Sequence, residues 1–346
     1  MLRSRPFDGE GDFPALRAFL VSLRSQVGPA CWHVGDLTWR TFLHGIHHDL
    51  SRTVRLWEDE KGILGFGILT PPRRGKDPSR RVAHFDLQVA PRTRGRGVEE
   101  AIVAWAESAS REMEEPGEAV AARVLVAEFV YEDEASPIRS LEELGFRRGD
   151  WEGTLLSRPL DAPTETPSLP DGFALRAMGG EGEISERAAA HREAFHPSRV
   201  TDEHYLRLFR MSEYRRALDL VAVSPEAAIA SFAIIWKDEV NREVEFEPVG
   251  TRPAFQRRGL GSAVLYEGLR RAKALGARSA VVGPVDLRDE PALRLYESVG
   301  FVRRASGVEL VRHRPPSGHP GLGLYTRPPS DDRARESSDE KSNSDR

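Results

Sequence analysis

The segment that most constrains the fold of this chain is the run VGTRPAFQRRGLG at residues 249–261. An alternating run precedes it at 243–249 and an amphipathic run follows at 262–274, so we expect a turn that joins a strand to a helix. Gly259 and Gly261 remove side chains where a backbone must approach another group closely, although glycine also serves ordinary tight turns. The free N–H groups of a first helical turn carry the positive end of the helix dipole, which favours binding of a phosphate or pyrophosphate.

Composition indicates a soluble globular protein with two domains. The chain has 346 residues, enough for two cores, and its 50 basic and 54 acidic side chains give a net charge of −4. This balance argues against a nucleic-acid or membrane-surface partner. No apolar run reaches about 18 residues and the N-terminus lacks a signal-peptide pattern, so we expect a cytoplasmic protein. The single cysteine, Cys31, excludes an internal disulfide and is expected to be a buried apolar residue rather than a nucleophile.

The same order of predicted elements occurs twice: helices, antiparallel strands, a strand–turn–helix, a strand, a helix and a strand. Residues 160–171 contain three prolines, which predicts a linker between domains at 1–159 and 172–326. Residues 327–346 are almost purely polar and are predicted to be disordered. The predicted helices span 13–27, 38–50, 98–109, 138–144, 183–195, 202–214, 262–274 and 291–299, and the predicted strands span 54–57, 63–69, 82–89, 122–130, 173–178, 218–224, 228–236, 243–251 and 279–282.

Two motifs together point to a known family. The pattern TxPxxQxxGxG at 251–261, followed by AxxLYxxxGF at 292–301, resembles the acetyl-CoA-binding and C-terminal motifs of the GNAT superfamily of N-acetyltransferases. The resemblance covers 173–312 well and 1–158 weakly, which implies a tandem GNAT similar in arrangement to mycothiol synthase. It implies an α/β fold in which each half is a mixed, mostly antiparallel sheet flanked by helices. The run WHVGDLxW at 32–39 also resembles the N-terminal halves of uncharacterised bacterial tandem GNATs, which implies no chemistry.

The resemblance implies acetyl-CoA as co-substrate and assigns residues to it. A bulge or an open strand edge is expected at Pro248, because proline cannot donate to a ladder, and an open edge would let the pantetheine arm pair like an extra strand. Asp289 stands where the family often has asparagine; it can still cap a helix. The resemblance makes Tyr296 the acid that protonates the CoA thiolate. The residues expected to contact the cofactor are Val249, Gly250 and Thr251 at the strand end, Gln256, Arg257, Arg258, Gly259, Leu260 and Gly261 around the pyrophosphate, and Asp289.

Alternating glutamates on the strand before the turn are candidates for the general base. Glu243, Glu245 and Glu247 are expected to share one face with Val249 and Thr251, because side chains alternate along a strand. Glu245 or Glu247 could take the proton of an amine directly or through water, with a pKa raised in a partly buried cleft. The alternative is that both are solvated side chains on a strand face.

The two halves are not equivalent. The run VxPxxRxxGxE at 89–99 aligns without a gap with 251–261, but Glu99 replaces the second glycine and would repel a pyrophosphate. Leu141 aligns with Tyr296, so the acid is also missing. The N-terminal half is therefore expected to be structural or to shape the acceptor site. The alternative is that arginines 92, 94 and 96 restore cofactor binding there.

We therefore predict an N-acetyltransferase with one active site, in the C-terminal half, and a primary amine as acceptor. The acceptor could be a small molecule, a peptide N-terminus or a lysine, and the alternative function is a non-catalytic CoA-binding sensor or scaffold. No metal is expected, because the HxxHHD run at 44–49 lacks further ligands and favours a solvated helix face. Candidates for the acceptor pocket are His191, Phe195, His196, His204, Tyr205 and Trp236.

Overall fold

The structure, a computed structural model, describes residues 2–74, 79–114, 122–132, 137–161, 163–164 and 168–314. The N-terminal half contains β1 (Arg3–Pro6), η1 (Gly9–Gly11), α1 (Phe13–Val27), α2 (Val34–Gly45), α3 (Leu50–Thr53), β2 (Val54–Asp59), β3 (Gly62–Arg74), β4 (Arg80–Val89), η2 (Pro91–Thr93), α4 (Val98–Glu112), β5 (Ala122–Tyr131), α5 (Ile138–Glu143) and β6 (Arg147–Pro159). The C-terminal half contains β7 (Ala174–Ala177), η3 (Glu181–Glu183), α6 (Ile184–Ala194), α7 (Asp202–Phe209), η4 (Arg216–Leu218), β8 (Asp219–Val223), β9 (Ile229–Asp238), β10 (Glu243–Thr251), η5 (Pro253–Phe255), α8 (Leu260–Ala274), β11 (Ser279–Asp286), α9 (Glu290–Ser298) and β12 (Val302–Arg314).

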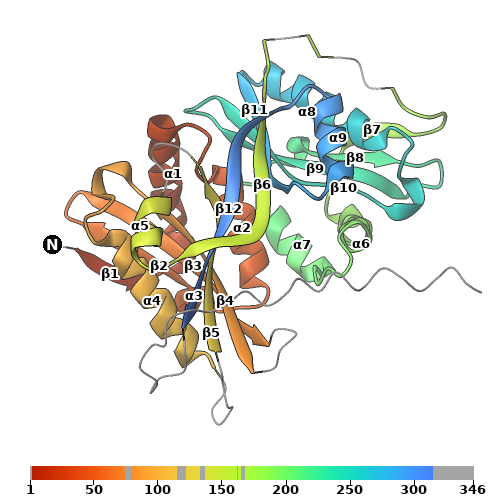
Figure 1. Cartoon of the computed structure of the whole chain (residues 1–346). Helices are drawn as coiled ribbons and strands as arrows, with labels where there is room; N and C mark the ends of the chain where they lie inside the picture. The colour runs from red at the N-terminus through yellow and green to blue at the C-terminus, as the bar shows by residue number, and fades with distance from the viewer. Residues whose placement is uncertain are drawn as a thin grey trace, which may run out of the picture.

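One continuous sheet runs through both halves, in the order β1-β2-β3-β4-β5-β12-β6-β11-β10-β9-β8-β7 (Figure 1). The pairs β4–β5 and β10–β11 are parallel and the other pairs are antiparallel, so the expected mixed, mostly antiparallel α/β fold is confirmed. If each strand of β1–β6 is swapped with its counterpart in β7–β12, the strand order reads the same from either end. The duplicated architecture predicted from the sequence is therefore built around a pseudo-two-fold axis at the centre of the sheet.

The two halves exchange their last strands. β6 closes the N-terminal half in sequence but pairs with β11, and β12 closes the C-terminal half but pairs with β5. The exchanged strands also pair with each other and lie side by side at the centre of Figure 1. The sequence analysis expected two separate sheets, and this exchange joins them. The domain limits at 159 and 172 and the linker at 160–171 stay predictions, and the tail at 327–346 lies outside the described residues.

Several helix ends differ from the sequence predictions for identifiable reasons. α2 begins at Val34 rather than at residue 38, because His33 and Asp36 form a reciprocal capping box around its first turn. It ends at Gly45, and α3 starts separately after the cap of Asp49. The edge strand β1 was not predicted, because the sequence RSRP has no apolar alternation.

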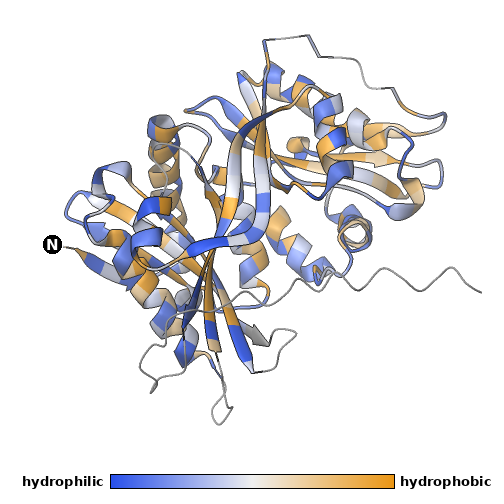
Figure 2. Cartoon of the chain, in the orientation of Figure 1, coloured by the Kyte–Doolittle hydropathy of each residue, from blue (hydrophilic) through white to orange (hydrophobic). Residues whose placement is uncertain are grey.

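Each half has its own hydrophobic core between the sheet and a long helix. The C-terminal core surrounds α8 and the N-terminal core surrounds α4, and Figure 2 shows hydrophobic residues on the central strands and on one side of these helices. A further cluster joins the halves, since Trp39 and Phe42 of α2 pack with Tyr205, Leu208 and Trp236. Cys31 is buried, as expected, and burial raises the pKa of its thiol to about 12. Among the described helices, none is long and apolar enough to cross a membrane.

Candidate active site

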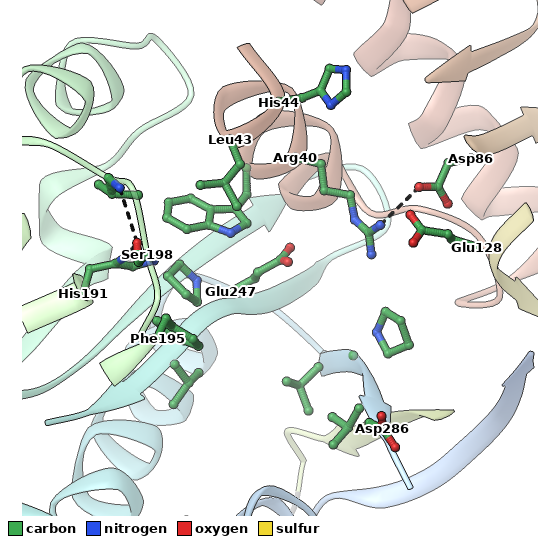
Figure 3. Close-up of a pocket in the computed structure, with 18 of the residues that line it drawn as sticks. Arg40, Leu43, His44, Asp86, Glu128, His191, Phe195, Ser198, Glu247 and Asp286 are labelled. Atoms are coloured by element: carbon green, nitrogen blue, oxygen red, sulfur yellow. Dashed lines mark hydrogen bonds and ion pairs between the residues drawn. The ribbon is translucent and has the colours of Figure 1, made fainter. Parts of the chain in front are cut away.

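A cavity of about 690 Å³ lies where β10 and β11 separate. The two strands pair only from Glu243 to Glu245, so the following residues of β10 have no neighbour on that side. The cavity walls come from β10, β11 and α9 of the C-terminal half and from α2, β4 and β5 of the N-terminal half. Figure 3 shows Glu247 between the His191–Phe195 side of the cavity and the Arg40–Asp86 side. The cavity therefore belongs to both halves.

A β-bulge at Pro248 changes the face of the sheet toward which the following side chains of β10 point. Phe246 pairs with Ile235 and Val249 with Ala233, so residues 247 and 248 contain one extra residue relative to β9. Val249 consequently packs in the same core as Phe246, and the expectation that it shares a face with the glutamates is wrong. The predicted bulge and open edge are both present, and the bulge points Val249 and Thr251 toward α8.

The turn before α8 has the geometry of an anion-binding loop. Arg257 and Gly259 both adopt positive φ angles, 59° and 76°, and Gly259 is the N-cap of α8 without a side-chain cap, so no side chain occupies the N–H groups of the first turn. A Cβ at Gly259 would meet nothing within 4 Å, and one at Gly261 would lie 3.6 Å from Thr251 Oγ1. The open strand edge, the uncapped turn and the cavity fit the pantetheine and pyrophosphate of acetyl-CoA.

The other residues expected to contact the cofactor lie around this turn. Gln256 donates to the carbonyl of Thr251 at 3.4 Å, and Arg258 donates to that of Ala254 at 3.3 Å, so both side chains stay near the loop. Leu260 is buried in the core below it. Gly250 is glycine for a different reason, because a Cβ there would lie 2.5 Å from the ring of Phe232.

Tyr296 and Asp289 lie where the sequence places them. Both line the cavity, and the Asp289 carboxylate accepts the N–H of Ala292 at 3.1 Å, which caps α9 as expected. Burial, and then the negative charges of Asp289 and Glu247, raise the pKa of Tyr296 above its ordinary value. The phenol therefore stays protonated until a strong base forms beside it.

The structure separates the two candidate bases. Glu247 lines the cavity, whereas Glu245 lies under the start of α2, 1% exposed, and does not line the cavity. Nδ1 of His33 lies 3.3 Å from Oε2 of Glu245 and already accepts the N–H of Gly35 at 3.0 Å. Burial, and then the charge of Asp36, raise the pKa of both glutamates well above the ordinary value. The alternative of a solvated strand-face residue is wrong for Glu245, whereas Glu247 is half-buried at the cavity and its role as the base stays a prediction.

Asp36 completes a group of three carboxylates. One oxygen each of Asp36, Glu245 and Glu247 lies within 4.8 Å of the other two, a spacing that a cation could bridge. The oxygens of Asp36 are already engaged, since Oδ1 accepts Nε of Arg40 at 3.0 Å and Oδ2 accepts the N–H of His33 at 2.8 Å. This engagement makes the group a poor metal site. The expected absence of a metal stays a prediction.

The matching site of the N-terminal half is filled. Gly95 and Gly97 have φ angles of 65° and 89°, so the turn before α4 has the same form as the turn before α8. Glu99, in the place of Gly261, is fully buried there, and burial raises its pKa. The cavity between β4 and β5 measures about 30 Å³, and Leu141, in the place of Tyr296, is part of the core.

Two of the six candidate acceptor residues, His191 and Phe195, line the cavity. The other four have different positions: His196 is exposed, His204 caps α7 with Thr201, Tyr205 is buried and donates to Asp219, and Trp236 lies behind Glu247, whose carbonyl it hydrogen-bonds at 2.6 Å. The histidines at 44, 47 and 48 also line the cavity; His47 is exposed, as expected of a solvated face, but only His44 lies on α2, which ends at Gly45.

Sequence analysis missed the residues of the N-terminal half that reach the site. Arg40 of α2, Asp86 of β4 and Glu128 of β5 line the cavity, and Arg40 lies 3.5 Å from Asp86 (Figure 3). Burial raises the pKa of Asp86 to about 8. The run at 32–39 could have signalled this contribution, because two tryptophans, a histidine and an aspartate at the start of a helix are unusual in a solvated turn.

Comparisons with known proteins agree with this geometry. Residues 186–301 match the family model described as the acetyltransferase (GNAT) family. The chain is 28% identical over 314 residues to a mycothiol acetyltransferase of Arthrobacter sp. (strain FB24), covering 84% of this chain and 88% of that protein. It is 31% identical over 180 residues to a mycothiol acetyltransferase of Salinispora arenicola (strain CNS-205), covering 49% and 57%.

Two solved structures share the fold of the whole chain. A GCN5-related N-acetyltransferase from Sphaerobacter thermophilus has a TM-score of 0.61 at 20% identity, covering 93% of this chain and 98% of that one. A tandem GNAT protein from the clavulanic acid biosynthesis pathway has a TM-score of 0.60 at 16% identity, covering 90% and 98%. Residues 186–301 therefore match the GNAT acetyltransferase family, and the whole chain has the fold of a solved tandem GNAT protein.

Proposed function

We propose that the protein transfers the acetyl group of acetyl-CoA directly to a primary amine, in a single active site of the C-terminal half. The observation that carries this proposal is that Glu247 and Tyr296 line one cavity, at the open edge of β10 and beside the uncapped turn of α8. A base, an acid and a cofactor cradle are the three parts that such a transfer requires.

Acetyl-CoA supplies the activated acetyl group as a thioester. The neutral amine forms the new N–C bond, the C–S bond breaks, and the two proton transfers fall to residues of this chain. Glu247 accepts the proton that the attacking nitrogen loses, directly or through water. Tyr296 gives its hydroxyl proton to the departing thiolate. The raised pKa makes Glu247 a stronger base, and the raised pKa of Tyr296 keeps its hydroxyl protonated, and so able to donate, before the C–S bond breaks.

Glu245 has a different role in this proposal. Oε2 of Glu245 lies 3.3 Å from Nδ1 of His33, but the single lone pair of Nδ1 already accepts the N–H of Gly35, so no hydrogen bond joins the two atoms. Burial lowers the pKa of His33 to about 4, so the imidazole is neutral at working pH. Because Glu245 is buried under α2 and does not line the cavity, it cannot reach an amine bound there, and the proposal assigns the role of base to Glu247.

The proposal leaves the N-terminal half without cofactor. Glu99 occupies the turn before α4, and the cavity beside it, at about 30 Å³, is too small for a pantetheine arm. The half at 1–159 instead supplies one wall of the acceptor site through Arg40, Asp86 and Glu128.

The charges of the cavity support a cationic acceptor. Five carboxylates line it, those of Asp86, Glu128, Glu247, Asp286 and Asp289. They outnumber the lining guanidinium groups, those of Arg40 and Arg199. Such a wall favours small amines over acidic acceptors. The acceptor of the mycothiol acetyltransferases belongs in the first test panel, because one of these relatives aligns with 84% of the chain.

The proposal is tested with acetyl-CoA calorimetry and a thiol-release assay on a panel of primary amines. Wild type should bind one equivalent, and Gly261→Glu, which copies the N-terminal half, should bind none. Glu247→Gln should lose about 10²–10⁴-fold in turnover while its matched control Glu245→Gln loses much less. Two equivalents in wild type, or equal losses in the two amide variants, would contradict the proposal. Tyr296→Phe separates the enzyme from a CoA sensor, since only an enzyme loses turnover while binding is retained.

A further inference from the structure

Three glutamates of β10, Glu243, Glu245 and Glu247, each lie close to a residue of the N-terminal half. The start of α2 and the end of α1 cover these side chains, and the contacts come in chain order. They are an ion pair of Arg24 with Glu243, the contact of His33 with Glu245, and the approach of Asp36 to Glu247 within the group of three carboxylates. The N-terminal half therefore determines the electrostatic surroundings of the proposed base.

Gly35 makes this approach possible. A Cβ at this position would lie 2.4 Å from Oε2 of Glu245 and 2.6 Å from two ring atoms of Trp236. The backbone of α2 thus rests directly on the C-terminal half. Because Trp236 also holds the carbonyl of Glu247 at 2.6 Å, the glutamate and the helix are fixed relative to each other.

The orientation of Asp36 is equally fixed. Its carboxylate accepts the backbone N–H of His33 and the guanidinium of Arg40, so both oxygens are held in place. The Asp36 carboxylate is thereby fixed within 4.8 Å of the Glu247 carboxylate. Arg40, one turn after Asp36 on the same helix, also reaches Asp86, at 3.5 Å.

We propose that Asp36 is a positioning residue for catalysis: its fixed negative charge acts across the boundary between the halves to make Glu247 a better proton acceptor, and Arg40 limits that effect. This inference rests on the proposed role of Glu247 as the base. When the attacking amine loses its proton, the proton moves to the Glu247 carboxylate, and the adjacent charge of Asp36 stabilises the neutral acid that results. The half without a cofactor thus takes part in every turnover.

Other groups also face these carboxylates and contribute to their titration. Arg24 and Arg40 oppose the effect of Asp36, and the acidic neighbours add to it. The titratable or charged groups on the packed elements are Arg24 of α1, His33 and Arg40 of α2, Asp86 of β4, Tyr131 of β5, Asp238 of β9, Glu243 and Glu245 of β10, and Tyr296 of α9.

The test is a pH titration of the Glu247 carboxyl carbon by ¹³C NMR on glutamate-labelled full-length protein, with the signal assigned by Glu247→Gln. A unit charge within 4.8 Å shifts a pKa by roughly 2.5 units at an effective dielectric constant of about 20. Asp36→Asn should move the midpoint down by about that amount. Arg40→Gln should move it up, and Arg40→Lys, which keeps the charge, should leave it nearly unchanged. Asp49→Asn is the matched control, because it removes an exposed N-cap acid elsewhere in the same half.

Opposite shifts in Asp36→Asn and Arg40→Gln, mirrored in the acidic limb of the kcat/KM profile for an accepted amine, would support the proposal. No shift, or equal shifts in Arg40→Gln and Arg40→Lys, would overturn it, because packing rather than charge would then be responsible. A midpoint that moves on adding magnesium or calcium would also overturn it, since the carboxylates would then hold a cation. If Asp36→Asn fails to fold, the comparison of Arg40→Gln with Arg40→Lys still tests the proposal. Retained turnover in Glu247→Gln would instead remove the proposed function and leave the titration intact.

Discussion

Alanine at position 35 tests how tightly the two halves are packed against each other. Intrinsic propensity alone says that Gly35→Ala should stabilise α2 by up to about 1 kcal/mol. The structure says the opposite, because the new methyl group would lie 2.4 Å from Glu245 and 2.6 Å from Trp236. Both neighbours are almost fully buried and cannot move aside. Overpacking of this kind costs about 1–3 kcal/mol, and rigid neighbours place this site in the upper part of that range, so we expect a net loss of about 2 kcal/mol.

The measurement is urea unfolding, together with a thermal shift of roughly 3–6 °C for a chain of this size. Gly182→Ala is the matched control, because a Cβ there meets nothing within 4 Å and its φ angle is ordinary. Turnover should fall as well, since displacement of Trp236 moves the carbonyl of Glu247 that it binds. A Gly35→Ala variant as stable as wild type, or more stable, would refute the close approach of α2 to β10.

Three further outcomes follow from the buried charges. Arg24→Met should lower the free energy of unfolding by about 3–5 kcal/mol in urea titrations, because it leaves Glu243 buried without its cation, and Glu243→Met in the same chain should restore most of the loss. Glu99 has a raised pKa in the fold, so its ionisation destabilises the native state at pH values above the pKa of an unfolded glutamate. Glu99→Gln should therefore be more stable than wild type at neutral pH. The unfolding curves of the two proteins should converge as the pH falls below the pKa of an unfolded glutamate. The raised pKa of Glu247 predicts that kcat/KM falls on acidification at a higher pH than an ordinary glutamate would require, and a profile flat down to the ordinary range would contradict its role as the base.

Local patterns predicted the cofactor turn well. The alternating strand, the glycine turn and the amphipathic helix are properties of neighbouring residues, and the structure has β10, Gly259 in a left-handed conformation and α8 where these patterns place them. The cap of α9 by Asp289 is equally local. The same locality made the gap-free alignment of 89–99 with 251–261 informative, since both turns share their positive φ angles.

Long-range relations could not be predicted in the same way. Strand alternation places Glu245 and Glu247 together with Val249, but a bulge at Pro248 reverses the faces, and a proline signals a bulge without fixing its register. The covering of Glu245 by α2 depends on residues more than 200 positions away in the chain. The strand exchange depends on two central strands, β6 and β12, whose sequences show no preference for one half over the other.

The exchange of β6 and β12 explains why the N-terminal half is indispensable to this fold. A chain lacking residues 1–159 would lose β6, and β11 would then present an unpaired edge beside the cavity. A chain that ends before residue 302 would leave β5 equally open. During synthesis the edge of β5 stays unpaired until β12, the last described strand, has been made. The two halves therefore complete one sheet together, and each half pairs with the other's final strand.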